Sequence, residues 1–248
     1  MELSIEDQIK KRGHWRVMIS PSEKFLNKVN IDISELSDII ADSQVRLRGW
    51  YYPHIDKKNG IKFSNQNEIK NECNFFNGHG EIWKFTTTGI FKHILSMKED
   101  YVINDQMAEE IKSRFVFNNN EAYHVKNFFA ILYNVYKFTE IFLFASSLAQ
   151  LEVYNDVKEF EIKIDLIRVK DRMLFMWDRG RDLYKPYICV IENDEINLSN
   201  KYKKEELIAN FDNYSLKMVT EAFMRFNWKN PNYQVFDQEQ KKLLERRL

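Results

Sequence analysis

Apolar residues follow two different spacings along this chain, and each spacing predicts one kind of element. In residues 158–169 apolar and polar positions alternate, which is typical of a strand that packs one face on a core and exposes the other to water. Residues 14–20 alternate in the same way. In residues 121–150 the few polar side chains recur at helical spacings and form one narrow stripe, so this segment predicts a long and mostly enclosed helix.

Shorter segments supply the remaining elements. Residues 81–97 predict a hairpin that turns at Gly89, a residue able to adopt a positive φ. Residues 51–77 contain Pro53 and many asparagines and are interpreted as a loop with room for one short helix. Further strands are expected at 44–50, 172–177, 187–192 and 195–198, and further helices at 33–41, 104–113, 203–210 and 214–228.

This order of elements favours an α+β fold in which mostly antiparallel sheet packs around the long helix at about 121–150. The chain has 248 residues and shows no composition shift that would mark a linker between domains. We therefore expect a single α+β domain over residues 1–236. Residues 237–248 are rich in charge and are expected to form a helical tail.

Charge and composition argue against several classes of protein. The 37 basic and 37 acidic residues balance, so no global field attracts nucleic acid, and any such binding needs a local patch. Lys137 and Glu140 interrupt the longest apolar stretch, which argues against a membrane-spanning helix. The first residues lack the apolar run of a secretion signal, and Cys73 and Cys189 stand far apart. These features predict a reducing, cytoplasmic setting and no membrane contact.

The most unusual segment is RLRGWYYPHID at residues 46–56, which concentrates basic and aromatic side chains where a strand is expected to end. Arginine and lysine attract phosphates, and exposed aromatic rings stack on unpaired bases. The segment therefore predicts a nucleic-acid contact surface, with an ordinary solvent-facing strand as the alternative. Its candidate contact residues are Arg46, Arg48, Trp50, Tyr51, Tyr52, His54, Lys57 and Lys58.

A second interpretation of the same region is a metal or acid–base site. His54 and Asp56 project to the same side of an extended chain, and glycines flank His79 on both sides. These three residues lack the spacing of a helical metal motif, so no metal is predicted. The chain also contains no P-loop, dinucleotide-binding glycine motif or nucleophile elbow, and no cofactor is expected.

The motif RLRGW-x-x-PHI, with GHW-x-V and GEIW-x-F around it, resembles a signature of largely uncharacterised bacterial proteins. Members of that family are sometimes fused to, or found beside, Schlafen-type AlbA domains. The resemblance covers residues 14–85. It implies a role in bacterial regulation or defence near nucleic acids, and it carries no catalytic residues over to this chain.

The sequence thus predicts a non-enzymatic bacterial interaction or regulatory protein that contacts a nucleic-acid or protein partner through residues 46–62. The competing hypothesis is a metal-dependent hydrolase or nuclease that uses His54, Asp56 and His79. The absence of enzyme motifs favours the first. The pattern of residues carries no signal for an oligomeric state.

Overall fold

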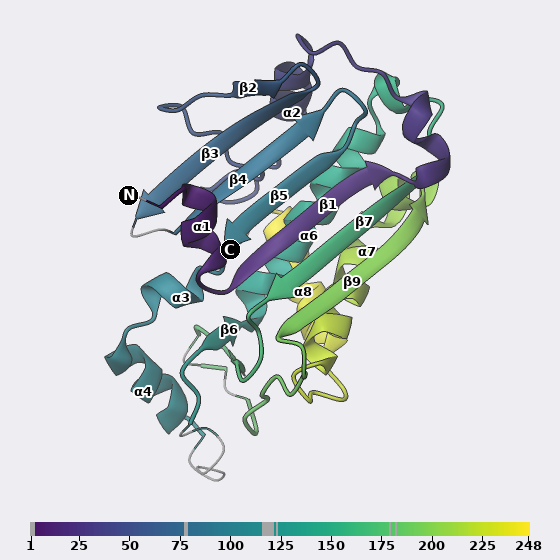
Figure 1. Ribbon diagram of the computed structural model, residues 1–248. Coiled ribbons are helices and arrows are strands. Elements are labelled where there is room, and N and C mark those ends of the chain that lie inside the picture. Colours follow the sequence, from purple (N-terminus) through teal and green to yellow (C-terminus); the bar gives the residue numbers. More distant parts are fainter. Residues whose placement is uncertain (1–2, 77–78, 116–121, 123, 179, 182) are drawn as a thin grey trace.

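The computed structural model describes residues 3–76, 79–115, 122, 124–178, 180–181 and 183–248. Within these residues a seven-stranded antiparallel sheet carries helices on both faces, and a small parallel pair of strands lies near one end (Figure 1). The α+β class with antiparallel sheet, expected from the alternation, is confirmed. The described chain has no helix that is both long and apolar enough to cross a membrane.

The strands of the large sheet follow the order β2-β3-β4-β5-β1-β7-β9. The N-terminal strand β1 therefore lies between a meander of four strands on one side and two strands from later in the chain on the other (Figure 1). The strand bounds are β1 (His14–Pro21), β2 (Lys62–Asn65), β3 (Glu68–Phe76), β4 (His79–Thr86), β5 (Phe91–Ser96), β7 (Glu159–Ile167) and β9 (Glu195–Lys203).

Helices cover the two faces of this sheet unequally (Figure 1). One face carries the three longest helices, α6 (Ile131–Ala149), α7 (Lys204–Met224) and α8 (Tyr233–Leu244). The other face carries the short helix α1 (Ile5–Lys10), which contacts β4 and β5. The shorter helical segments are the 3-10 turns at Glu23–Lys28 and Glu152–Tyr154 and the helices α2 (Leu36–Ser43), α3 (Glu99–Val102) and α4 (Asp105–Ser113).

The core lies between the large sheet and α6. Alternate residues of β1, namely Trp15, Val17 and Ile19, face the helices and are at most 2% exposed. The ring of Phe138 on α6 meets the ring of Trp15 edge-on, with 5.2 Å between their centroids. The two-residue period of the strand and the 3.6-residue period of the helix thereby build one continuous apolar layer.

The long helix begins later than its pattern predicts. The described helix α6 starts at Ile131, whereas Phe128–Ala130 form strand β6, which pairs in parallel with β8 (Met173–Phe175). The expected start at residue 121 lies outside the described residues. The apolar run continues through both elements, so hydrophobicity alone does not separate them. The separating interaction is pairing with a strand from far along the chain.

Long-range pairing also changes other expected elements. Within the described residues, segment 44–50 forms no strand and contributes only an isolated bridge between Val45 and Tyr52. Residues 187–192 likewise contribute one bridge, between Ile188 and Met173. The segment interpreted as a loop, 51–77, contains β2 and β3, because β4 supplies a partner along the whole length of β3.

Helix α8 contains most of the segment that was expected as a charged tail. Its Phe236 and Leu243 are buried among the core residues. The amide Nε2 of Gln240, also buried, donates to Thr139 Oγ1 at 2.9 Å and to Ser215 Oγ at 2.7 Å. Apolar packing and satisfied polar contacts therefore hold this helix on α6 and α7.

The contact between Phe138 and Trp15 predicts a large effect on stability. Replacing Phe138, which is fully buried, with alanine should lower the free energy of unfolding by about 3–5 kcal/mol because it opens a cavity in the core. Phe63 is 69% exposed, so Phe63→Ala is the matched control and should change stability by less than about 0.5 kcal/mol. Urea unfolding of both variants measures the difference, and equal losses would contradict this packing.

Candidate functional site

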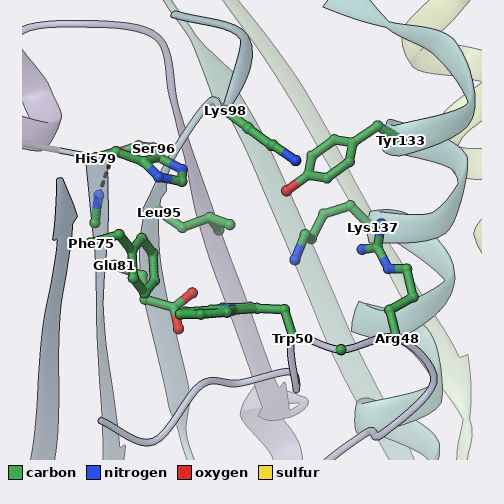
Figure 2. Close-up of a pocket in the computed structure, with 12 residues that line it drawn as sticks. Arg48, Trp50, Phe75, His79, Glu81, Leu95, Ser96, Lys98, Tyr133 and Lys137 are labelled. Carbon is green, nitrogen blue, oxygen red and sulfur yellow. Dashed lines mark hydrogen bonds between the residues drawn. The ribbon is translucent and has the colours of Figure 1, made fainter. Parts of the chain in front are cut away.

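A cavity of about 370 Å³ opens between the sheet and the first half of α6 (Figure 2). Its size falls in the range typical of small-ligand pockets. The lining comes from residues 48–50, from the adjacent ends of β3, β4 and β5, from Lys98 between β5 and α3, and from α6. The side chains that define it are Arg48, Trp50, Phe75, His79, Glu81, Leu95, Ser96, Lys98, Tyr133 and Lys137.

A short bridge positions the loop that closes one side of this cavity. Val45 and Tyr52 exchange two backbone hydrogen bonds, at 2.8 and 3.0 Å, so the residues between them form a tight loop. Tyr52 anchors the loop, because its side chain is buried and its hydroxyl lies 3.2 Å from His93 Nδ1. The loop consequently presents Trp50 at the cavity while its base stays fixed.

A buried group of charges joins this loop to α6. Arg48 donates to both oxygens of Glu140, from Nε at 2.8 Å and from NH2 at 2.6 Å. Lys137 Nζ lies 3.3 Å from the same carboxylate, of which only 1% is exposed. Burial alone lowers the pKa of Arg48, but the charge and hydrogen bonds of Glu140 outweigh burial and raise it. Arg48 is therefore a fixed, charged clamp.

A second buried carboxylate, Glu81, lies on the sheet side of the cavity. Its Oε1 accepts from the backbone N–H of His54 at 3.0 Å, and its Oε2 lies 3.2 Å from His93 Nε2. Burial raises the pKa of Glu81, but the hydrogen bond and charge of His93, together with Lys137, outweigh burial and lower it. Glu81 is therefore ionised at neutral pH and helps to hold the cation of Lys137 in the interior.

His79 is a neutral group on the same wall. Burial lowers its pKa to about 4; the charges of Lys98 and Lys137 act in the same direction and Glu81 acts against them. At neutral pH its imidazole carries no charge and offers one donor and one acceptor nitrogen.

The cavity carries a local excess of positive charge. Arg48, Lys98 and Lys137 contribute three cations against the two carboxylates of Glu81 and Glu140, which leaves one net positive charge. Among the described residues no carboxylate lies within ion-pair distance of the exposed Lys98, whose Nζ lies 5.5 Å from the centre of the Tyr133 ring. Figure 2 shows the ammonium groups of Lys98 and Lys137 directed into the cavity.

Five of the eight predicted contact residues lie on the surface as expected. Arg46 is exposed and its guanidinium lies 5.4 Å from the centre of the Tyr51 ring, and Lys57 and Lys58 are also exposed. Trp50 and Tyr51 are 44% and 42% exposed. These side chains are accessible to a partner.

The other three predicted residues have different positions. The prediction that Tyr52 contacts a partner is wrong, because its ring is 1% exposed and packs on Phe144. Arg48 is bound to Glu140 instead of facing solvent as an open cation. His54 is half-buried, and its ring stacks on the Trp50 indole with 3.9 Å between centroids.

The structure does not bring His54, Asp56 and His79 together. The ring of Phe75 packs against both histidines, at 5.8 Å from His54 and 5.0 Å from His79. The Asp56 carboxylate accepts from Lys58 N and from Asn59 Nδ2 within its own turn. Within the described part of the chain, no group of three or more His, Cys, Asp or Glu residues could hold a metal ion.

Several lining residues were missed from the sequence, among them Phe75, Glu81, Lys98 and Tyr133. Ordinary packing or solvation explains each of these residue types at its position in the sequence. One signal was present, namely the charges of Lys137 and Glu140 within a very apolar helix. A buried charge needs a partner, so such positions indicate that another charged residue approaches the helix.

Comparison with models of protein families, with curated proteins and with solved structures yields no match for this chain. The site is therefore interpreted from its geometry. The resemblance of residues 14–85 to the bacterial family stays a prediction.

The buried ion pairs of Glu140 with Arg48 and Lys137 should contribute far more to the free energy of unfolding than an exposed ion pair does. Glu140→Gln should lower the free energy of unfolding by about 3–5 kcal/mol, because Arg48 and Lys137 lose their shared counter-charge in the interior. The pair of Arg16 and Glu195 has the same 2.6 Å separation, but its side chains are 46% and 30% exposed, so Glu195→Gln should cost at most about 1 kcal/mol. Chemical denaturation of both variants provides the test, and similar losses would refute the role of Glu140.

The lowered pKa of His79 predicts a measurable pH dependence. In the folded protein its ring should titrate near 4, whereas the unfolded chain titrates near the ordinary value of 6.5. The unfolded state then binds the extra proton between these values, so the free energy of unfolding should fall as the pH falls from about 6.5 to about 4. Histidine ring NMR signals report the titration, with His79→Gln as the assignment control. A folded-state midpoint above 6 would contradict the buried environment.

Proposed function

We propose that this protein is a non-enzymatic binding protein for single-stranded nucleic acid, and that one nucleotide enters the cavity beside Trp50. The observation that carries the proposal is the convergence of aromatic rings and cations around one cavity of about 370 Å³ in a chain with no net charge. Stacking surfaces combined with positive charge are the usual means of binding unpaired nucleotides.

The aromatic part of the cavity suits a base. The Trp50 indole is 44% exposed, yet His54 stacks on it and Phe75 packs edge-on against it at 4.3 Å. A ring held by two neighbours loses little conformational freedom when a ligand binds, which favours affinity. Stacking on such a ring contributes about 1–3 kcal/mol per base.

The basic part of the cavity suits a phosphate. Lys137 approaches from α6, opposite His79 and Phe75, and Lys98 approaches from just beyond the end of β5; their ammonium groups point into the opening (Figure 2). Lysine ammonium groups bind phosphate oxygens as point charges. A base against Trp50 and a phosphate near Lys98 together account for both halves of the lining.

Other occupants are less well supported. A metal-dependent reaction lacks a metal-ligand cluster among the described residues. The stacked Trp50 ring and the two lysine ammonium groups match the base and the phosphate of one nucleotide. We therefore favour nucleic acid over protein as the partner.

Trp50→Ala should weaken binding of a fluorescent oligothymidylate of about ten nucleotides by about five- to a hundredfold, because one base loses its stacking surface. Trp177 is similarly exposed, at 40%, but lies outside this cavity, so Trp177→Ala is the matched control and should leave affinity unchanged. Fluorescence anisotropy at low salt measures both. Failure of the wild-type protein to bind, or equal affinities of wild type and Trp50→Ala, would refute the proposal.

A further inference from the structure

A second cavity, of about 400 Å³, lies where β1 begins and β7 ends. Four exposed cationic side chains line it, Lys11 and Arg12 before β1 and Arg168 and Lys170 after β7. With Arg172 they make five cations against the two carboxylates of Asp100 and Asp194, an excess of three positive charges. We call this the basic cleft. In a chain whose total charge is zero, this is a strong local concentration.

The floor of the basic cleft is a buried ion pair. Arg172 is 1% exposed and binds both oxygens of Asp100, at 2.5 and 2.6 Å. The same carboxylate accepts from the backbone N–H of Gly13 at 2.7 Å. A side chain at Gly13 would collide with the Arg172 guanidinium, so glycine permits this close approach. Both carboxylate oxygens of Asp100 therefore already accept hydrogen bonds from within the protein.

Backbone carbonyls, not carboxylates, hold the arginines at the rim. Arg12 NH1 donates to the carbonyl oxygen of Asp100 at 2.6 Å, and Arg168 Nε donates to the carbonyl oxygen of Lys10 at 3.1 Å. A neutral acceptor orients a guanidinium without cancelling its charge. The rim is therefore ordered and remains electropositive.

The basic cleft adjoins the cavity beside Trp50 through one aromatic side chain. The Tyr101 ring on α3 lies 5.1 Å from the ring of His79, which lines the first cavity. Tyr101 also contacts the basic cleft, because the guanidinium of Arg12, which lines the cleft, lies 4.6 Å from the centre of the Tyr101 ring. Helix α3 therefore separates two sites that are close enough to share one ligand chain.

The two cavities differ in chemistry. The first is lined by aromatic rings, whereas the described lining of the basic cleft contains no aromatic or aliphatic residue. Bases need stacking surfaces, and phosphates need charge. We infer that the basic cleft binds the phosphodiester backbone of the same strand whose nucleotide occupies the cavity beside Trp50. The inference rests on the proposed function and extends it to a strand that passes over α3.

The test uses the double variant Lys11→Gln/Lys170→Gln in the full chain. Both side chains are exposed, so folding should be unaffected, as circular dichroism can verify. The matched control, Lys24→Gln/Lys28→Gln, removes the same charge from exposed positions in the 3-10 turn beyond the opposite end of β1. The probes are thymidine monophosphate and an oligothymidylate of about ten nucleotides.

The double variant should bind the oligonucleotide about tenfold more weakly and should lower its salt slope by about 1.4, because two phosphate contacts are lost from a single strand. Its affinity for thymidine monophosphate should be unchanged, and the control should match wild type with both probes. Unchanged oligonucleotide affinity in the double variant would overturn the inference.

The Trp50→Ala variant separates this outcome from failure of the proposed function. If Trp50→Ala weakens binding of both probes and the double variant changes neither, the first cavity binds nucleotides and the basic cleft does not hold the backbone. If the double variant weakens oligonucleotide binding and Trp50→Ala has no effect, the cleft contacts the strand and the assignment of the first cavity is wrong. Absence of binding to either probe by the wild-type protein would overturn both.

Discussion

The carboxylate of Glu140 constrains the whole region around the candidate site. It is almost completely buried on a helix whose neighbouring positions form the apolar core, and a charge in that position requires close partners. Arg48 and Lys137 meet this requirement from two directions. Because Arg48 belongs to the loop after Val45, its pairing fixes that loop over α6 and creates one wall of the cavity. The cavity thus follows from the need to neutralise one buried charge.

Two adjacent acids on α3, Glu99 and Asp100, perform a comparable role. Glu99 accepts from the backbone N–H of Ala130 at 2.8 Å and from Asn134 Nδ2 at 3.2 Å, which ties α3 to the start of α6. Burial raises the pKa of Glu99. The next residue, Asp100, binds Arg172 under the basic cleft. Two adjacent carboxylates therefore hold a very short helix in place between the two cavities, although four residues would form no stable helix alone.

The proposed binding mode uses these structural charges indirectly. Two tightly bound ion pairs, Arg48 with Glu140 and Arg172 with Asp100, have their charges satisfied within the protein and fix the shape of the cavities. The cations that remain accessible, such as Lys98, Lys11 and Lys170, stand at the rims of the two cavities. The interior charges pair with one another, whereas the rim cations stay accessible. A protein with no net charge can therefore attract phosphates locally.

Sequence periodicity alone determined the α+β class, the strand β7 with its wet face and the enclosed character of α6. These features depend on whether neighbouring side chains face water or core, and that information repeats every two or 3.6 residues. Only the tertiary structure decided that Phe128–Ala130 leave the helix for a strand, that Arg48 clamps Glu140 and that Tyr52 is buried. Each of these depends on a partner far away in the chain, and local spacing contains no information about which distant residue will provide it.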